Sequence, residues 1–352
     1  MNRKKVLIFI QDGVGGAERM SVLIGKNLSS NLFNVRFCLV DCGAKNSIKD
    51  FLPSSIFVER IIRRNPLILA IKMVKSIMLF RPDVVFSSVF NLNTKFLLFR
   101  WLFPSVKVIV RCDNYLYTYN KMQQILIKNT YPEADVIIAQ TEEMRDELIS
   151  IGIPVVKMVV LHNPKHRQTI EEMLKNVESP YPSNGRKHFV ASGRFAYQKG
   201  FDYLLDAFIM LNNKRDDCDL YIVGDYEYDN RKVYNQIMSR AQSMGVANRV
   251  FCLGYQTNPY RYVKFADCFV LSSRWEGLPN VLIESLYLGT PVAAFKCVPV
   301  IERIVENCKT GFHSVKGDIE SLCIAMNSAL SLGRIKSTYL ASDISDFVNL
   351  FA

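Results

Sequence analysis

Short apolar runs rich in β-branched residues alternate along the chain with longer stretches of helical periodicity. In the first half, this pattern predicts strands at residues 5–11, 34–40, 83–87, 107–111, 136–139 and 156–161. Helices are expected between them, for example over residues 17–29, 67–80 and 142–149. Strands that alternate with helices in this way are typical of βαβ units with a parallel sheet.

The same alternation starts afresh in the second half of the chain. Strands are expected at residues 188–192, 219–223, 250–253, 267–272 and 291–294, and helices over 201–211, 231–243 and 280–288. Between the halves, residues 163–187 are polar and rich in proline, which is the composition of a linker.

The chain is therefore predicted to be an α/β protein with two Rossmann-like, doubly wound domains that face each other across a cleft. Its 352 residues, 49% of them hydrophobic, suffice for two cores. We expect an N-terminal domain over 1–165, a linker over 166–187 and a C-terminal domain over 188–336. A last amphipathic helix is expected over 337–352, with its return to the N-terminal domain left open.

The net charge of +11 is unevenly distributed. Residues 1–170 hold 24 Lys and Arg against 13 Asp and Glu, whereas residues 171–352 hold 20 of each. One-sided basicity indicates an anionic partner for the first domain, either a membrane surface or a phosphorylated acceptor. Nucleic acid is not expected as a partner, because the chain lacks zinc-finger, RNP-like or basic-helix patterns.

The basic excess concentrates in residues 61–107, where Asp83 is the only acid amid many apolar residues. This composition suits a surface that dips into an anionic membrane interface. The alternative is a pair of core helices whose cations extend to water. The cations are Arg63, Arg64, Lys72, Lys75, Arg81, Lys95, Arg100 and Lys107.

A glycine-rich loop follows the first expected strand and opens a helix, with Gly15, Gly16 and Glu18 in it. Adjacent glycines let backbone N–H groups approach an anion closely at a helix N-terminus. The alternative is a turn that only packs the helix on the sheet.

Two cations, Arg194 and Lys199, stand in the loop after the first strand of the second domain. Ligands of doubly wound sheets bind at the carboxyl ends of the strands, where this loop lies. An arginine fork and a lysine charge can together clamp a diphosphate, although solvated loop cations are the plain alternative.

Two carboxylates eight residues apart form the next pattern. Glu276 is expected in an exposed loop, and Glu284 in the early turns of a helix that begins at Pro279. Both suit hydrogen bonding to vicinal hydroxyls of a sugar or ribose. A solvated Glu284 is disfavoured because it interrupts an apolar run.

Together these motifs resemble the retaining glycosyltransferases of family 4, which have the GT-B fold, and the resemblance covers essentially the whole chain. It implies that Arg194, Lys199 and Glu276 are the catalytic residues, the cations at the donor diphosphate and Glu276 at the transferred sugar. Glu284 would hold the ribose, and the loop at Tyr255 the base. The implied donor-binding set is Gly15, Gly16, Arg194, Lys199, Tyr255, Glu276, Gly277, Leu278, Pro279, Asn280 and Glu284.

Two loops depart from the family pattern. Many members carry a histidine where this chain has Asp113 and Asn114, so either residue, or Glu18, is a candidate for orienting the acceptor or sugar. The loop over residues 295–302 lacks the usual glycines, so the choice of donor sugar does not follow from the resemblance.

The resemblance implies retaining transfer of a hexose or N-acetylhexosamine from a nucleotide diphosphate sugar, with UDP favoured. No metal or cofactor is implied, and the D-x-D of Asp217 and Asp219 is expected to be a solvated turn at the amino end of a strand. Alternatives are a nucleotide-sugar epimerase and a non-catalytic donor-binding subunit.

The expected acceptor is a lipid-linked oligosaccharide or a glycan in bacterial lipopolysaccharide or capsule biosynthesis. Cytoplasmic localisation at the inner membrane face is expected for two reasons. The nine cysteines lack a C-x-x-C pair, and the first apolar run is too short for a secretory signal.

Overall fold

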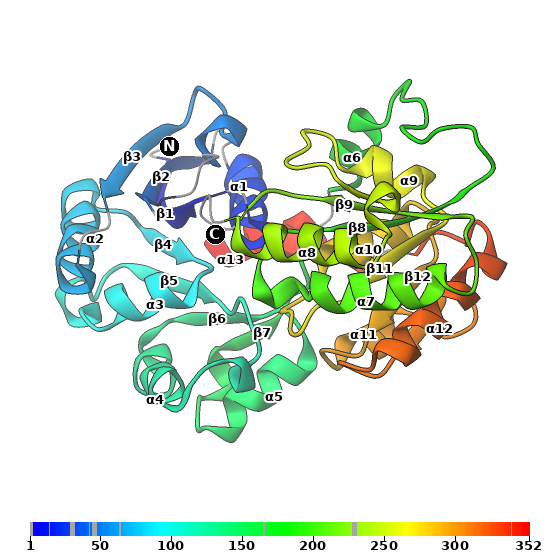
Figure 1. The fold of residues 1–352 in the computed structure, drawn as a ribbon. Coiled ribbons are helices and arrows are strands. Elements are labelled where there is room, and N and C mark those ends of the chain that lie inside the picture. Colours follow the sequence, from blue (N-terminus) through cyan, green and yellow to red (C-terminus); the bar gives the residue numbers. More distant parts are fainter. Residues whose placement is uncertain are drawn as a thin grey trace. The chain divides into compact units, whose positions relative to one another are not determined.

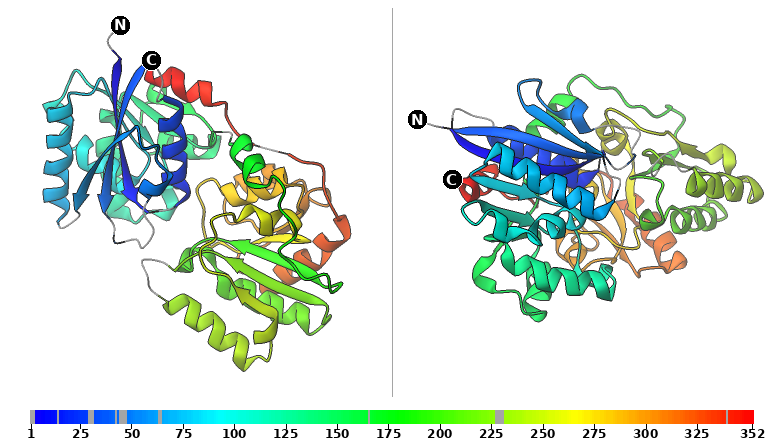
Figure 2. Two further views of the ribbon diagram at one scale, coloured as in Figure 1. Left: turned by 90° about the horizontal axis from the view of Figure 1, so that it is seen from above. Right: turned by 90° about the vertical axis from the view of Figure 1, so that its left-hand side faces the viewer.

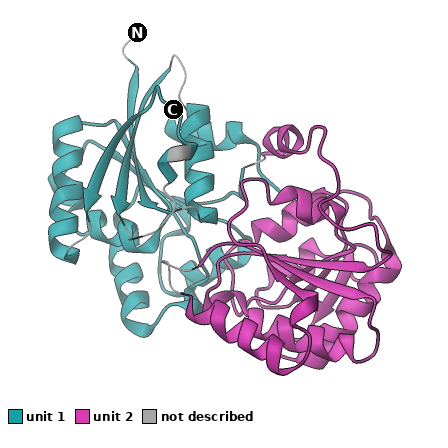
Figure 3. Cartoon of the chain, turned by 45° about the horizontal axis from the view of Figure 1, so that its top comes forward, with its two compact units in different colours: residues 1–165, 341–352 teal, residues 166–340 magenta. Residues whose placement is uncertain are grey.

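The computed structural model describes residues 3–13, 15–28, 32–41, 43, 48–62, 65–164, 166–226, 231–338 and 340–352. The chain divides into two compact units (Figure 3). Unit 1 comprises residues 1–165 and 341–352, and unit 2 comprises residues 166–340.

Among the described residues, unit 1 is built on a seven-stranded parallel sheet of order β3-β2-β1-β4-β5-β6-β7 (Figure 1). The strand order reverses between β1 and β4, which is the mark of a doubly wound sheet. The strands are β1 (Lys4–Asp12), β2 (Phe33–Asp41), β3 (Phe57–Ile62), β4 (Val84–Ser87), β5 (Lys107–Arg111), β6 (Val136–Ala139) and β7 (Met158–Val160).

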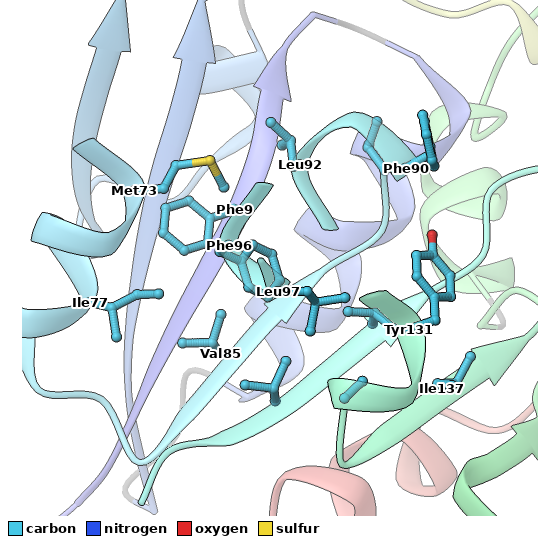
Figure 4. Close-up of a cluster of buried hydrophobic side chains, with 14 of the residues drawn as sticks. Phe9, Met73, Ile77, Val85, Phe90, Leu92, Phe96, Leu97, Tyr131 and Ile137 are labelled. Atoms are coloured by element: carbon cyan, nitrogen blue, oxygen red, sulfur yellow. The ribbon is translucent and has the colours of Figure 1, made fainter. Parts of the chain in front are cut away.

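Helices cover both faces of this sheet and bury one core on each. The core on the α2 and α3 side includes Phe9 and Phe96, whose rings stack with centroids 5.8 Å apart (Figure 4). The helices are α1 (Gly16–Leu28), α2 (Pro66–Phe80), α3 (Phe90–Leu97), α4 (Lys121–Thr130), α5 (Glu142–Ser150) and α13 (Ile344–Phe351).

Unit 2 has a six-stranded parallel sheet of order β10-β9-β8-β11-β12-β13 within its described residues. Its strands are β8 (Lys187–Ser192), β9 (Cys218–Val223), β10 (Val250–Cys252), β11 (Cys268–Leu271), β12 (Val292–Phe295) and β13 (Gly311–Ser314). Its helices are α6 (Arg167–Met173), α7 (Phe201–Asn212), α8 (Lys232–Ser243), α9 (Tyr260–Phe265), α10 (Asn280–Tyr287), α11 (Val300–Ile304) and α12 (Ile319–Ala329). The prediction of two Rossmann-like, doubly wound sheets is confirmed.

Two expected segments differ in the structure. Residues 166–187, predicted as a linker, belong to unit 2 and contain α6, because Ile170 buries its side chain against Leu174 and Tyr260. The terminal helix begins at Ile344, later than predicted. It belongs to unit 1, where Figure 2 shows it in red beside the blue elements, and Phe351 packs edge-on against Phe86 at 5.5 Å.

Helix α1, which follows the glycine loop, packs unusually close to the sheet at Gly25. A Cβ atom there would lie 2.4 Å from the Phe37 ring and 2.9 Å from Ile8 Cδ1. Both neighbours are fully buried. The glycine therefore sets the distance at which α1 lies on β1 and β2.

We predict that Gly25→Ala destabilises unit 1 by about 1–3 kcal/mol, because the added methyl overpacks the core. In an unconstrained helix the same change stabilises by about 0.5–1 kcal/mol. Native-state hydrogen exchange of peptides from β1 and β2 measures the unfolding free energy of unit 1. The exposed neighbour Lys26→Ala is the control and should change it by less than about 0.5 kcal/mol. A more stable Gly25→Ala protein would contradict the close packing.

Candidate functional site

Several loops of unit 2 meet at the carboxyl edge of its sheet. The Gly193 N–H donates a hydrogen bond to the Val223 carbonyl at 2.9 Å, and the Gly224 N–H donates to the Gly254 carbonyl at 2.9 Å. These bonds tie the loops after β8, β9 and β10 together. Arg194 is exposed and Tyr255 half-buried on the two outer loops.

Lys199 and Glu276 form the polar centre of this edge. Lys199 Nζ lies 2.7 Å from Glu276 Oε1, and the Ser273 hydroxyl donates to the same oxygen at 2.6 Å. The side chains of Lys199 and Glu276 are only 17% and 9% exposed. The expectation that Glu276 stands in an exposed loop is therefore wrong, because the lysine and the serine fold over it.

The loop that carries Lys199 approaches the end of β11 very closely. A Cβ atom on Gly200 would lie 2.1 Å from the Ser272 carbonyl oxygen, and Gly200 has a φ of +60°, in the left-handed region. The Ser272 hydroxyl in turn donates to the Lys199 carbonyl at 3.0 Å. Only glycine permits this approach without strain, so it is Gly200 that brings Lys199 to Glu276.

Arg274 braces the same two loops from the other side. Its guanidinium donates to both carboxylate oxygens of Asp202 at 2.9 and 2.6 Å and to the Tyr197 carbonyl at 2.8 Å. It also stacks over the Tyr197 ring at 3.8 Å and over the Tyr203 ring at 4.2 Å. Burial opposes the ionised form of Asp202, but the hydrogen bonds and charge of Arg274 outweigh it and lower the pKa of Asp202.

Glu284 is buried on α10, as expected for a residue that interrupts an apolar run. Its Oε1 lies 2.9 Å from His166 Nε2 and 3.5 Å from the Tyr260 hydroxyl. The sequence gives no signal for His166, because its segment has the composition of a linker. Gly277, Leu278 and Pro279 are buried and Asn280 half-exposed in the segment before Glu284, with Pro279 as the N-cap of α10 and not its first helical residue.

Unit 1 holds the remaining predicted residues. Gly16 begins α1 directly after Gly15, and Glu18 lies in the first turn of that helix. In the loop after β5, Asp113 accepts a hydrogen bond from the Tyr119 hydroxyl at 2.7 Å, and burial raises the pKa of this carboxyl. Asn114 is half-buried beside it.

The D-x-D sequence lies at the amino end of β9 as expected, where Asp217 stands in a bend with its side chain 45% exposed, but Asp219 is not solvated. Asp219 is 3% exposed within β9 and accepts from Arg186 Nε at 2.9 Å. Hydrogen bonds from Arg215 lower the pKa of Asp217 to about 2. Both carboxylates are thus neutralised by arginines. Among the described residues, no group of three or more His, Cys, Asp or Glu side chains is placed to hold a metal.

Comparison with known proteins identifies the class of enzyme. The profile of the glycosyl transferases group 1 matches residues 174–341, and that of glycosyltransferase family 4 matches residues 14–164. The chain therefore belongs to the glycosyltransferases of family 4, a retaining family.

Relatives agree with this assignment. An uncharacterized glycosyltransferase of Haemophilus influenzae is 25% identical over 91% of this chain and 88% of its own length. The amylovoran biosynthesis glycosyltransferase AmsD of Erwinia amylovora is 26% identical over 83% of this chain and 81% of its own. The solved structure of Anabaena HepE with UDP-glucose has the same fold, with a TM-score of 0.78, 17% identity and coverage of 99% of this chain and 98% of that one.

We predict that Asp202→Asn lowers the unfolding free energy of unit 2 by about 1 kcal/mol at pH 7. Loss of a hydrogen bond to a charged group costs about 1.5–3 kcal/mol, reduced here because the Asp202 side chain is 52% exposed. The pKa of Asp202 is lowered in the folded state, so its stabilisation is present above the ordinary pKa and is lost as pH falls. Wild type and variant should therefore converge as the pH falls through the lowered pKa of Asp202.

Urea titration monitored by tryptophan fluorescence tests this, since in a Trp101→Phe background Trp275 of unit 2 is the remaining tryptophan. Asp206→Asn on the same helix removes the partner of Arg240, whose side chain is 52% exposed, and should cost less than about 0.5 kcal/mol. Equal losses in the two variants would argue against a bracing role for Arg274.

Proposed function

We propose that this chain moves a hexose or N-acetylhexosamine from a UDP-sugar to a lipid-linked or glycan acceptor, with retention at the anomeric carbon. The observation that carries the proposal is the contact of Glu276 with both Lys199 and Ser273 at the carboxyl edge of the unit 2 sheet. A cation and a carboxylate held together there suit a substrate that carries both phosphates and hydroxyls.

In the proposed reaction, the bond from the anomeric carbon to the leaving phosphate oxygen breaks as an acceptor hydroxyl attacks the same face. The acceptor proton passes to the departing phosphate. Arg194 and Lys199 stabilise the negative charge of that phosphate, which is an electrostatic task. Glu276 accepts hydrogen bonds from sugar hydroxyls, and Glu284 accepts them from the ribose.

The donor and the pathway are proposed from relatives. HepE was solved with UDP-glucose, which supports a UDP-sugar as the first donor to test. AmsD acts in amylovoran biosynthesis, and a Campylobacter jejuni relative, 25% identical over 75% of this chain and 66% of its own, is an N-acetylgalactosaminyltransferase named for a diphospho-undecaprenol acceptor. A place in bacterial surface polysaccharide assembly, at the cytoplasmic membrane face, is the corresponding proposal.

The outer face of α2 supports a membrane-bound location. Leu67, Ile71 and Leu79 are 61%, 55% and 73% exposed, and Trp101 beyond α3 is 73% exposed. Surface helices normally turn polar residues outward, so this apolar face needs a partner. Lys72 and Lys75 lie on the same exposed face. Of the expected basic residues, Arg63 and Arg64 lie outside the described residues.

A hollow of about 290 Å³ adjoins this face and is lined by Ile71, Val74, Lys75, Met78, Leu79, Phe99 and Leu102. Apolar side chains can insert into the interface of a bilayer, and lysines beside them attract anionic lipid headgroups. No described helix is both long and apolar enough to cross a bilayer. We therefore propose peripheral binding through α2 and its neighbours, with the inner face of α2 packed in the core.

We predict that Lys199→Ala lowers kcat for sugar transfer by about 10²–10³-fold, the usual cost of losing a group that stabilises transition-state charge. Glu284→Gln should instead raise KM for the donor about tenfold, since it weakens a hydrogen bond made in the ground state as well. The donor is first identified by thermal shift with UDP- and GDP-sugars, and transfer and hydrolysis are then measured. Lys214→Ala, an exposed lysine at the end of α7, is the control.

Full activity of a folded Lys199→Ala protein would refute the site assignment. Conversion of the donor without any acceptor would favour the epimerase alternative. Donor binding that never leads to transfer or hydrolysis would favour a non-catalytic subunit.

Binding to vesicles tests the α2 surface. We predict that the protein sediments with vesicles of phosphatidylcholine and phosphatidylglycerol but not with phosphatidylcholine alone. Lys72→Glu with Lys75→Glu should weaken binding more than tenfold, at about 1 kcal/mol for each lysine removed. Val156→Ser is the control, because Val156 is 87% exposed elsewhere on unit 1. Binding that is indifferent to lipid charge and to the lysines would exclude this surface.

A further inference from the structure

His166 is the first residue of unit 2 along the chain and contacts the carboxylate proposed to hold the ribose. Its Nε2 lies 2.9 Å from Glu284 Oε1. The two side chains are 8% and 12% exposed, so the contact is largely shielded from water. The residues are 118 positions apart in the sequence, and the folding of α6 onto α10 brings them together.

Helix α6 is held firmly against α10. Ile170 is fully buried in a cluster with Leu174 and Tyr260, against which Tyr287 of α10 also packs. The Tyr287 hydroxyl donates to the Glu171 carboxylate. The Arg167 guanidinium lies 5.2 Å from the centre of the Tyr287 ring. Apolar packing, a hydrogen bond and a cation–π contact therefore fix the position of His166 before any ligand arrives.

The geometry also determines what His166 does for the carboxylate. An ionised carboxylate only accepts hydrogen bonds, so Nε2 must carry the proton in this contact. A shielded carboxylate without such a donor would bear a desolvation cost. Within the described part of the chain, Oε1 of Glu284 has hydrogen-bond partners and Oε2 has none. One oxygen is thus anchored by the protein and the other is left for a ligand hydroxyl.

We propose that His166 is a positioning residue for nucleotide binding, which anchors Oε1 of Glu284 so that Oε2 faces the ribose hydroxyls of the donor. The inference rests on the proposed function and deepens it. It assigns a role to a residue of the segment between the two sheets, where the sequence predicts only a linker. His166 itself does not touch the donor. Its effect is confined to the ribose and does not extend to the diphosphate.

Calorimetric titration separates these two parts of the ligand. The probes are UDP, GDP, their 2′,3′-dideoxy forms and inorganic pyrophosphate. We expect His166→Ala to weaken the ribonucleotide roughly 5- to 20-fold and to leave the dideoxy form and pyrophosphate within about twofold, as for loss of one charged hydrogen bond. His166→Gln, whose side-chain amide can donate from a similar position, should restore most of the affinity. Turnover should show a raised KM and a kcat within about twofold.

Gln168→Ala, an exposed position on α6, controls for disturbance of the helix. Equal weakening of ribose and dideoxy forms by His166→Ala, or no weakening of either, would overturn the role of His166 alone. Failure of His166→Gln to improve on His166→Ala would do the same. Failure of the wild-type protein to bind either nucleotide would overturn the proposed function, and this inference with it.

Discussion

The contact between Lys199 and Glu276 is the constraint on which the rest of the site depends. Taking a cation and a carboxylate out of water is costly unless each has further polar partners. Here the Ser273 hydroxyl donates a second hydrogen bond to Glu276 Oε1. In the proposed reaction, the donor diphosphate gives Lys199 a stronger anionic partner, and the sugar hydroxyls replace Lys199 as hydrogen-bond donors to Glu276. The pair keeps both groups shielded from water, and under this proposal the donor replaces their mutual contact.

That contact depends in turn on a close approach of backbone segments, which a sequence motif does not reveal. The absence of a side chain on Gly200 lets its loop lie against the Ser272 carbonyl. Arg274 then locks the two loops through Asp202 and two tyrosine rings. Lys199 and Glu276 are thus held at the edge of the sheet by backbone contacts and by Arg274. In the sequence, nothing distinguishes this arginine from the other residues that precede Glu276.

The parallel arrangement of the strands explains why the positions of Lys199 and Glu276 could be predicted from the sequence. Their carboxyl ends meet at one edge, so Lys199 after β8 and Glu276 after β11 had to be neighbours once the strands were recognised. Strands β3 and β13 were missed because both are edge strands with polar residues such as Glu59 and His313, which blur the apolar pattern. His166 was missed for another reason, since a contact across 118 residues leaves no local signal.

The path of the chain adds a last constraint. Residues 341–352 belong to unit 1 and bury Phe347 and Phe351 in its core, although unit 2 precedes them in sequence. The two segments that connect the units are paired where they leave unit 1, since the Ser342 N–H donates to the Asn163 carbonyl at 3.2 Å. The buried Arg111 guanidinium donates to the Asn163 side chain and ties this pair to strand β5. His166 follows Asn163 by three residues in the sequence, and its Nε2 contacts Glu284 Oε1. The carboxylate proposed for the ribose is therefore held by the first residue of unit 2, in the segment whose composition predicts only a linker.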